Sequence, residues 1–154
     1  MTTVHAPLFL PDPGATTRLA RSLAPLLRAG DCLLLDGQIG AGKTHFARAL
    51  IQWFTAEDVP SPTFTLVQTY DAPAFEIWHA DLYRLSHPDE AIELGLTEAF
   101  ETALCLVEWP GKLGGDAPKQ ALTLRFSPLQ EGREVQFTSH DDTWKTRLRA
   151  LDDV

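Results

Sequence analysis

Two helical stripes of apolar residues lie on either side of a short apolar run in the first third of the chain. The first stripe follows Asp12, a candidate N-cap, and Pro13, a residue favoured in the first helical turn, and predicts a helix that ends at about Ala29. Its apolar positions are Leu19, Leu23, Leu26 and Leu27. The run Cys32–Asp36 predicts a strand covered on both faces. The second stripe, which predicts another helix, consists of Phe46, Ala47, Leu50, Ile51 and Phe54.

The rest of the chain predicts strands interspersed with shorter helices. Strands are expected at residues 4–10, 63–70, 74–79 and 103–108, and alternating apolar positions predict a hairpin near 122–126 and 135–137. Helices are expected at residues 86–94, where Gly95 ends the helix, and around Trp144, Leu148 and Leu151. A loop is expected at residues 111–118. The order of elements predicts one α/β domain over residues 1–154, with a mixed β-sheet flanked by helices and a C-terminal β-hairpin plus helix.

Composition and charge narrow the class of protein. The chain has 44% hydrophobic and 22% charged residues, which is typical of a soluble globular protein, and we expect a cytoplasmic one. Cys32 and Cys105 both lie in apolar runs, which indicates reduced core residues. The formal net charge of −8 argues against direct tight binding of naked nucleic acid, because phosphate contacts need concentrated positive charge. A role in nucleic-acid chemistry would therefore run through a protein partner.

The turn between the first apolar strand and the second helix carries the strongest chemical signal. Gly37-Gln-Ile-Gly-Ala-Gly-Lys-Thr44 matches the P-loop pattern G-x-x-x-x-G-K-[ST], in which backbone N–H groups and a helix N-terminus face phosphate oxygens. Lys43 is expected to reach the β- and γ-phosphates, and Thr44 to ligate Mg²⁺. This predicts a P-loop NTPase-like fold. The predicted nucleotide-binding residues of this segment are Gly37, Gln38, Ile39, Gly40, Ala41, Gly42, Lys43, Thr44 and His45.

Two acidic residues compete for the second position at a P-loop metal site. Glu108 follows the apolar run Leu104–Val107, whereas Asp81 follows a less apolar run that contains His79. Because the metal-side acid of P-loop enzymes ends a buried strand, hydrophobicity favours Glu108 for the metal, and it leaves Asp81 as the candidate that positions or polarises attacking water. The alternative for each is a solvated carboxylate at a strand end. His79 is interpreted as a hydrogen-bonded structural histidine.

Four segments, GQIGAGKTHF, SPTFTLVQTY, HADLYRL and LVEWP, occur in an order and spacing that resemble the TsaE family, also called YjeE. These are small bacterial P-loop ATPases of tRNA threonylcarbamoyladenosine biosynthesis, and the resemblance runs from about Leu10 to Val135. The chain departs from the family pattern at Gln38, His45 and Ala80, none of which the P-loop mechanism depends on.

The resemblance implies an ATPase that is weak alone and works with Mg²⁺ beside the TsaD- and TsaB-type subunits, which attach threonylcarbamoyl to adenosine 37 of tRNAs reading ANN codons. It implies that Thr44 and Glu108 serve Mg²⁺ and that Asp81 is needed for turnover. It further implies a γ-phosphate-sensing switch segment at Ser61, Pro62 and Thr63, and nucleotide contacts from Arg133 and, more weakly, Thr16.

Other interpretations stay open beside this one. Arg133 could be an exposed turn residue, and Arg84 could pair with a local carboxylate or stabilise phosphate charge. A small-molecule P-loop kinase usually carries an arginine-rich lid, yet between Ala49 and Leu124 the only Lys and Arg residues are Arg84, Lys112 and Lys119. The remaining alternative is a nucleotide sensor that binds without hydrolysis.

Overall fold

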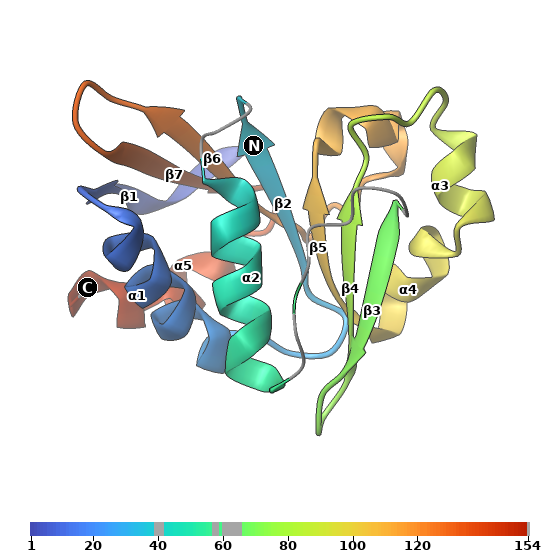
Figure 1. The fold of residues 1–154 in the computed structure, drawn as a ribbon, viewed down its shortest axis with the longest axis horizontal. Coiled ribbons are helices and arrows are strands. Elements are labelled where there is room, and N and C mark those ends of the chain that lie inside the picture. Colours follow the sequence, from blue (N-terminus) through green and yellow to red (C-terminus); the bar gives the residue numbers. More distant parts are fainter. Residues whose placement is uncertain (39–41, 57–58, 60–65, 154) are drawn as a thin grey trace.

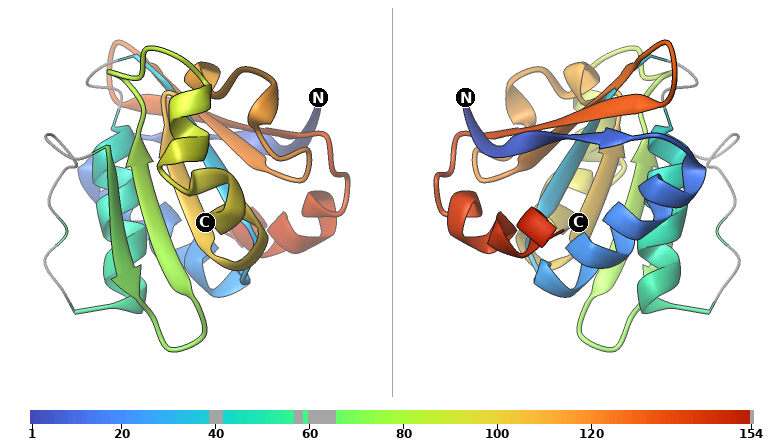
Figure 2. Two further views of the ribbon diagram at one scale, coloured as in Figure 1. Left: turned by 90° about the vertical axis from the view of Figure 1, so that its right-hand side faces the viewer. Right: turned by 90° about the vertical axis from the view of Figure 1, so that its left-hand side faces the viewer.

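A seven-stranded mixed sheet forms the centre of the molecule in a computed structural model, which describes residues 1–38, 42–56, 59 and 66–153. The strand order is β1-β7-β6-β2-β5-β4-β3. The parallel core contains β6 (Leu122–Pro128), β2 (Cys32–Gly37), β5 (Leu104–Glu108) and β4 (Glu76–Asp81). The outer strands β1 (Thr2–Leu10), β7 (Arg133–Ser139) and β3 (Val67–Asp71) pair antiparallel to their neighbours. Figure 2 shows the twist of the sheet, with β1 and β7 lying across the direction of β3 and β4.

Helices cover both faces of this sheet (Figure 1). One face packs against α1 (Pro13–Leu23), η1 (Ala24–Leu26), α2 (Lys43–Phe54), α5 (Trp144–Arg147) and η3 (Leu148–Asp153). The other face packs against α3 (Asp89–Glu93), α4 (Leu96–Thr102) and η2 (Pro110–Asp116). The α/β fold with a mixed sheet, flanking helices and a C-terminal hairpin is therefore confirmed.

The boundaries of several helices differ from the prediction. The first helix ends at Leu23 instead of Ala29 and continues only as a 3₁₀ turn, because Pro25 lacks the N–H that an α-helix needs and its ring clashes with the preceding turn. Gly95 does end a helix, but with φ 84° it also starts α4, which the sequence did not predict. The predicted C-terminal helix is α-helical only over α5, and the predicted loop 111–118 contains η2.

The two strands at the centre of the sheet, β2 and β5, are largely buried. Every residue of β5 is buried, as expected for a strand covered on both faces. Cys32 and Cys105 are register partners on β2 and β5, and both are buried free thiols. Burial raises the pKa of the Cys105 thiol to about 12, so it stays protonated and inert. In the part of the chain that the structure describes, every helix is too short or too polar to cross a bilayer.

Candidate functional site

The carboxyl ends of three parallel strands and the N-terminus of α2 converge at one edge of the sheet. The register of β4 and β5 places Asp81 beside Glu108, and the register of β2 and β5 places Leu35 beside Glu108. Because β2 ends at Gly37 and α2 begins at Lys43, these two ends of the P-loop segment lie at the same edge as both acids. Ligands of open α/β sheets bind at this edge, beyond the carboxyl ends of the strands.

A buried chain of hydrogen bonds links α2, β5 and β4. The Thr44 hydroxyl donates to Glu108 Oε1 over 2.9 Å, and His79 Nε2 lies 2.7 Å from Glu108 Oε2. Glu108 is only 2% exposed and His79 is fully buried. Both carboxylate oxygens of Glu108 are therefore engaged, one by the helix that carries the P-loop lysine and one by the neighbouring strand.

Lys43 lies next to these acids without a direct ion pair. Its ammonium donates to the Gly37 carbonyl over 2.6 Å and sits 3.7 Å from the centre of the Trp109 ring. Burial lowers the pKa of Lys43, and the charges of Glu108, Asp36 and Asp81 partly oppose that shift. Within the described residues no carboxylate lies within 4.0 Å of the Lys43 nitrogen.

Trp109 follows β5 in a strained backbone conformation. Its φ of 59° is left-handed, and among the described residues it is the one non-glycine with positive φ. For a residue with a Cβ this conformation costs roughly 1 kcal/mol, and such strain is typical of functional sites. The turn brings the indole over Lys43 and 5.0 Å from the ring of Tyr83, which is half exposed. No sequence pattern predicts this contact of Trp109, because the backbone geometry alone orients its ring.

Asp81 occupies a different environment from Glu108. One of its carboxylate oxygens accepts the Tyr83 N–H over 3.1 Å, and the side chain is partly exposed. Burial raises the pKa of Asp81, the Tyr83 N–H counteracts this, and the negative charge of Glu108 raises it further. A carboxylate with a raised pKa accepts a proton more readily, which suits a group that polarises water.

The β6–β7 hairpin brings Arg133 to the P-loop. A Cβ on Gly42 would lie 2.6 Å from an Arg133 guanidinium nitrogen, so the arginine packs directly against this glycine. Gly132, with φ 77°, packs against the Leu10 carbonyl, where a Cβ would come within 2.4 Å. These two glycines permit the close approach, and they place a cation at the start of α2.

Other predicted residues lie apart from this cluster or outside the described residues. Thr16 is buried in α1, and its hydroxyl has no hydrogen-bond partner among the described residues; the neighbouring Thr17 bonds to His45 over 3.0 Å instead. Arg84 is exposed and makes no ion pair with any described residue. The predicted residues outside the described part of the chain are Ile39, Gly40, Ala41, Ser61, Pro62 and Thr63.

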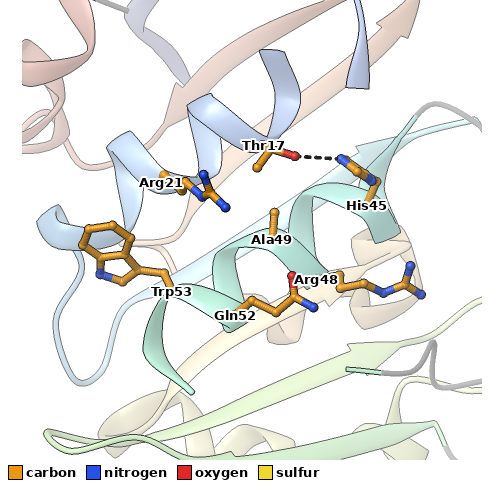
Figure 3. Close-up of a pocket in the computed structure, with 7 residues that line it drawn as sticks. All are labelled: Thr17, Arg21, His45, Arg48, Ala49, Gln52 and Trp53. Carbon is orange, nitrogen blue, oxygen red and sulfur yellow. Dashed lines mark hydrogen bonds between the residues drawn. The ribbon is translucent and has the colours of Figure 1, made fainter. Parts of the chain in front are cut away.

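Two cavities flank the P-loop region. A groove of about 880 Å³ runs past Gly37, Gln38, Tyr83 and Trp109. A smaller pocket of about 300 Å³ lies between α1 and α2 (Figure 3), where Arg21 points between the helices and the Thr17–His45 hydrogen bond closes one end. The groove adjoins Trp109 over Lys43, so it adjoins the predicted phosphate site.

The Thr44 hydroxyl and the Glu108 carboxylate are oxygen ligands of the kind that Mg²⁺ binds. The described residues hold no cluster of three or more His, Cys, Asp or Glu side chains arranged for a metal, which excludes an all-protein cage among them. Mg²⁺ usually needs only one or two protein oxygens, with phosphates and water as its other ligands. Thr44 Oγ1 and Glu108 Oε1 lie 2.9 Å apart, joined by a hydrogen bond, and would together supply two such oxygens.

The fold and this edge of the sheet define a P-loop NTPase-like protein. The chain belongs to the TsaE family, because the family model described as "Threonylcarbamoyl adenosine biosynthesis protein TsaE" matches residues 10–135. The family assignment made from the four sequence segments is thereby confirmed.

Relatives agree with this assignment, and a solved structure shares the fold. A protein of Bacillus subtilis named "tRNA threonylcarbamoyladenosine biosynthesis protein TsaE" is 34% identical over 83% of this chain and 82% of its own length. Relatives of the same name in Rickettsia bellii and Rickettsia conorii are 42% and 50% identical; the match spans 85% of the first protein and only about half, 55%, of the second. The crystal structure of Bacillus subtilis YdiB superposes with a TM-score of 0.76 over 96% of this chain and 94% of its own, at 24% identity, which supports the fold.

Proposed function

We propose that this chain is an ATP-binding and weakly ATP-hydrolysing accessory subunit in the formation of threonylcarbamoyladenosine at position 37 of tRNAs that read ANN codons. The family and the names of the relatives support the pathway. The observation that carries nucleotide binding is the 2.9 Å hydrogen bond that joins Thr44, at the N-terminus of α2, to Glu108 at the end of β5.

Several residues at this edge take part in the proposed chemistry. The backbone N–H groups of the P-loop and of the first turn of α2 bind phosphate oxygens. Lys43 leaves the Gly37 carbonyl and the Trp109 ring to contact the β- and γ-phosphates. Arg133, packed on Gly42, adds a positive charge near the start of α2. The family resemblance adds Ser61, Pro62 and Thr63 as a segment that senses the γ-phosphate.

Glu108 and Asp81 divide the acid chemistry between them. Thr44 and Glu108 hold Mg²⁺, which when bound offsets negative charge on the phosphates. Asp81, beside Glu108 but with its own orientation fixed by the Tyr83 N–H, holds the attacking water and takes up its proton. Glu108 is less suited to that task, because it is buried and its two oxygens already contact Thr44 and His79.

Protein partners complete the proposed activity. The net charge of −8 disfavours direct contact with naked tRNA, so the chain acts through TsaD- and TsaB-type subunits. The groove beside Tyr83 and Trp109 adjoins the proposed phosphate site, which supports a partner contact near the nucleotide.

Reconstitution tests this proposal. Purified chain is combined with the TsaD- and TsaB-type subunits of the same genome, and phosphate release from ATP and modified adenosine in tRNA are measured together. We expect both products to depend on this chain and to fall sharply with Asp81→Asn, whereas the exposed control Asp71→Asn leaves them unchanged. Transfer of labelled γ-phosphate to a small molecule would indicate a kinase, and modification without any phosphate release would indicate a sensor.

A further inference from the structure

His79 is a fully buried polar residue of β4 to which the proposed chemistry assigns no step. It lies two residues before Asp81 on the same strand, so its side chain points to the same face as that of Asp81. Its Nε2 atom is 2.7 Å from Glu108 Oε2, between side chains that are 1% and 3% exposed. A buried polar contact this short determines how the carboxylate is oriented.

We propose that His79 is a positioning residue that holds the Glu108 carboxylate in the orientation that binds Mg²⁺. The inference rests on the proposed function, since it takes Thr44 and Glu108 as the metal ligands. With Oε2 held by His79, Oε1 faces the Thr44 hydroxyl over 2.9 Å, so the two proposed ligand oxygens lie side by side.

The hydrogen-bond pattern assigns the proton of the imidazole. Nδ1 of His79 is buried and has no hydrogen-bond partner among the described residues. A buried N–H without an acceptor is more costly than a buried lone pair on an aromatic nitrogen, so the proton resides on Nε2 and is donated to Glu108. His79 thus donates one hydrogen bond, from Nε2, to Oε2 of Glu108, the proposed metal ligand.

Loss of this hydrogen-bond donor should weaken metal binding more than nucleotide binding. Without it, Oε2 of the buried Glu108 lacks a partner, and the carboxylate can rotate away from Thr44 to find one. Mutation of a group that orients a metal ligand in this way typically lowers metal affinity by about 10- to 100-fold. The contacts of Lys43 and the P-loop backbone with phosphate involve no atom of His79.

The test compares two substitutions by metal and nucleotide titration. His79→Leu removes the donor, whereas His79→Gln retains an N–H near the position of Nε2. Binding of a fluorescent ATP analogue is measured with excess EDTA and across an Mg²⁺ titration, and Mn²⁺ binding in the presence of nucleotide is followed by electron paramagnetic resonance. Ser139→Ala is the control, because it removes buried hydrogen bonds near the opposite end of the sheet. His79→Asn, whose amide is too short to reach Glu108, replaces His79→Leu if the latter does not fold.

We expect His79→Leu to weaken Mg²⁺ and Mn²⁺ binding by about 10-fold. Its affinity for the ATP analogue in EDTA should stay within about twofold of the wild-type value. His79→Gln should be close to the wild type in both measurements. Equal losses with and without metal, or no rescue by Gln, would overturn the positioning role. A wild-type chain whose nucleotide binding ignores Mg²⁺ would instead refute the proposed function, so the two failures are distinguishable.

Discussion

Two buried polar networks lie at opposite ends of the central strands, and they are built differently. At the amino end, before β2, Asp31 accepts a hydrogen bond from Arg147 over 3.0 Å, and the guanidinium also packs on the Trp144 ring. At the carboxyl end, Lys43 faces a carbonyl and an indole ring, while Glu108 faces a hydroxyl and an imidazole.

The difference lies in how the charges are balanced. The amino-end network pairs a largely buried cation with a largely buried anion, so each charge has its counter-ion within the chain. The carboxyl-end network holds Lys43 and Glu108 without a charged Lys, Arg, Asp or Glu partner among the described residues, and buried charges of that kind cost free energy. Such a cost is typical of a functional site, where a ligand supplies the missing charges: phosphate for the lysine and a divalent cation for the carboxylate.

The largest expected effect on stability comes from breaking the paired network. Arg147→Ala leaves Asp31 buried without its cation and should lower the free energy of unfolding by about 3 kcal/mol, or roughly 6–12 °C in Tm. Nucleotide affinity of the folded variant should be unchanged. Calorimetry and nucleotide titration check both points, and a loss of nucleotide affinity would show that the two networks are coupled.

Lys43→Ala should give the opposite result. Removing a charge-assisted contact to phosphate should weaken nucleotide binding roughly 100-fold, equivalent to about 2.7 kcal/mol. The Tm should change little, because the lysine has no ion pair to lose among the described residues, and removal of a desolvated charge offsets the lost contacts with the Gly37 carbonyl and the Trp109 ring. Titration of a fluorescent ATP analogue and a thermal melt measure the two effects. A large fall in Tm would show that Lys43 stabilises the fold, as Arg147 does, and that the two networks do not differ in this way.

Trp109 provides a smaller test, based on backbone strain. Trp109→Ala and Trp109→Gly both remove the ring over Lys43, but only glycine adopts φ 59° without steric cost. The glycine variant should therefore be about 1 kcal/mol more stable than the alanine variant in urea unfolding. Equal stabilities would mean that the turn relaxes when the ring is absent.

Asp81→Asn should stabilise the chain slightly at neutral pH. Because the folded-state pKa of Asp81 is raised, chiefly by burial, its ionised form is penalised above that pKa, and the penalty disappears below the ordinary carboxyl value of about 4. The variant should exceed the wild type in Tm by on the order of 2 °C at pH 7 and match it near pH 3. Melting curves across this range check the sign, and a variant less stable at pH 7 would refute it.

Much of the fold follows from local patterns in the sequence. The strand before the P-loop and the apolar stripe of α2 are local signals, and the structure places both elements where they are predicted. The missed helix α4 carries a helical signal in Leu96, Ala99 and Phe100, but Gly95 also satisfied the pattern of a helix end. A glycine with positive φ can end one helix and begin the next, and the sequence alone does not distinguish the two cases.

The candidate site was less predictable than the fold. Glu108 and Asp81 could be singled out because each ends an apolar run, but their placement side by side depends on the register of β4 and β5. The His79–Glu108 contact and the Lys43–Trp109 contact arise from that register and from one left-handed backbone turn. Neither feature leaves a periodic signal in the sequence.

One paired measurement tests most directly whether Glu108 binds the metal and Asp81 positions the attacking water. Mg²⁺-dependent ATP binding and single-turnover hydrolysis with the partner subunits are measured for Asp81→Asn and Glu108→Gln. We predict that Asp81→Asn retains Mg²⁺-dependent affinity while its hydrolysis falls roughly 100-fold, and that Glu108→Gln loses the Mg²⁺ dependence of binding. Equal loss of Mg²⁺-dependent binding in both variants would contradict the assignment of Asp81 to water and Glu108 to the metal.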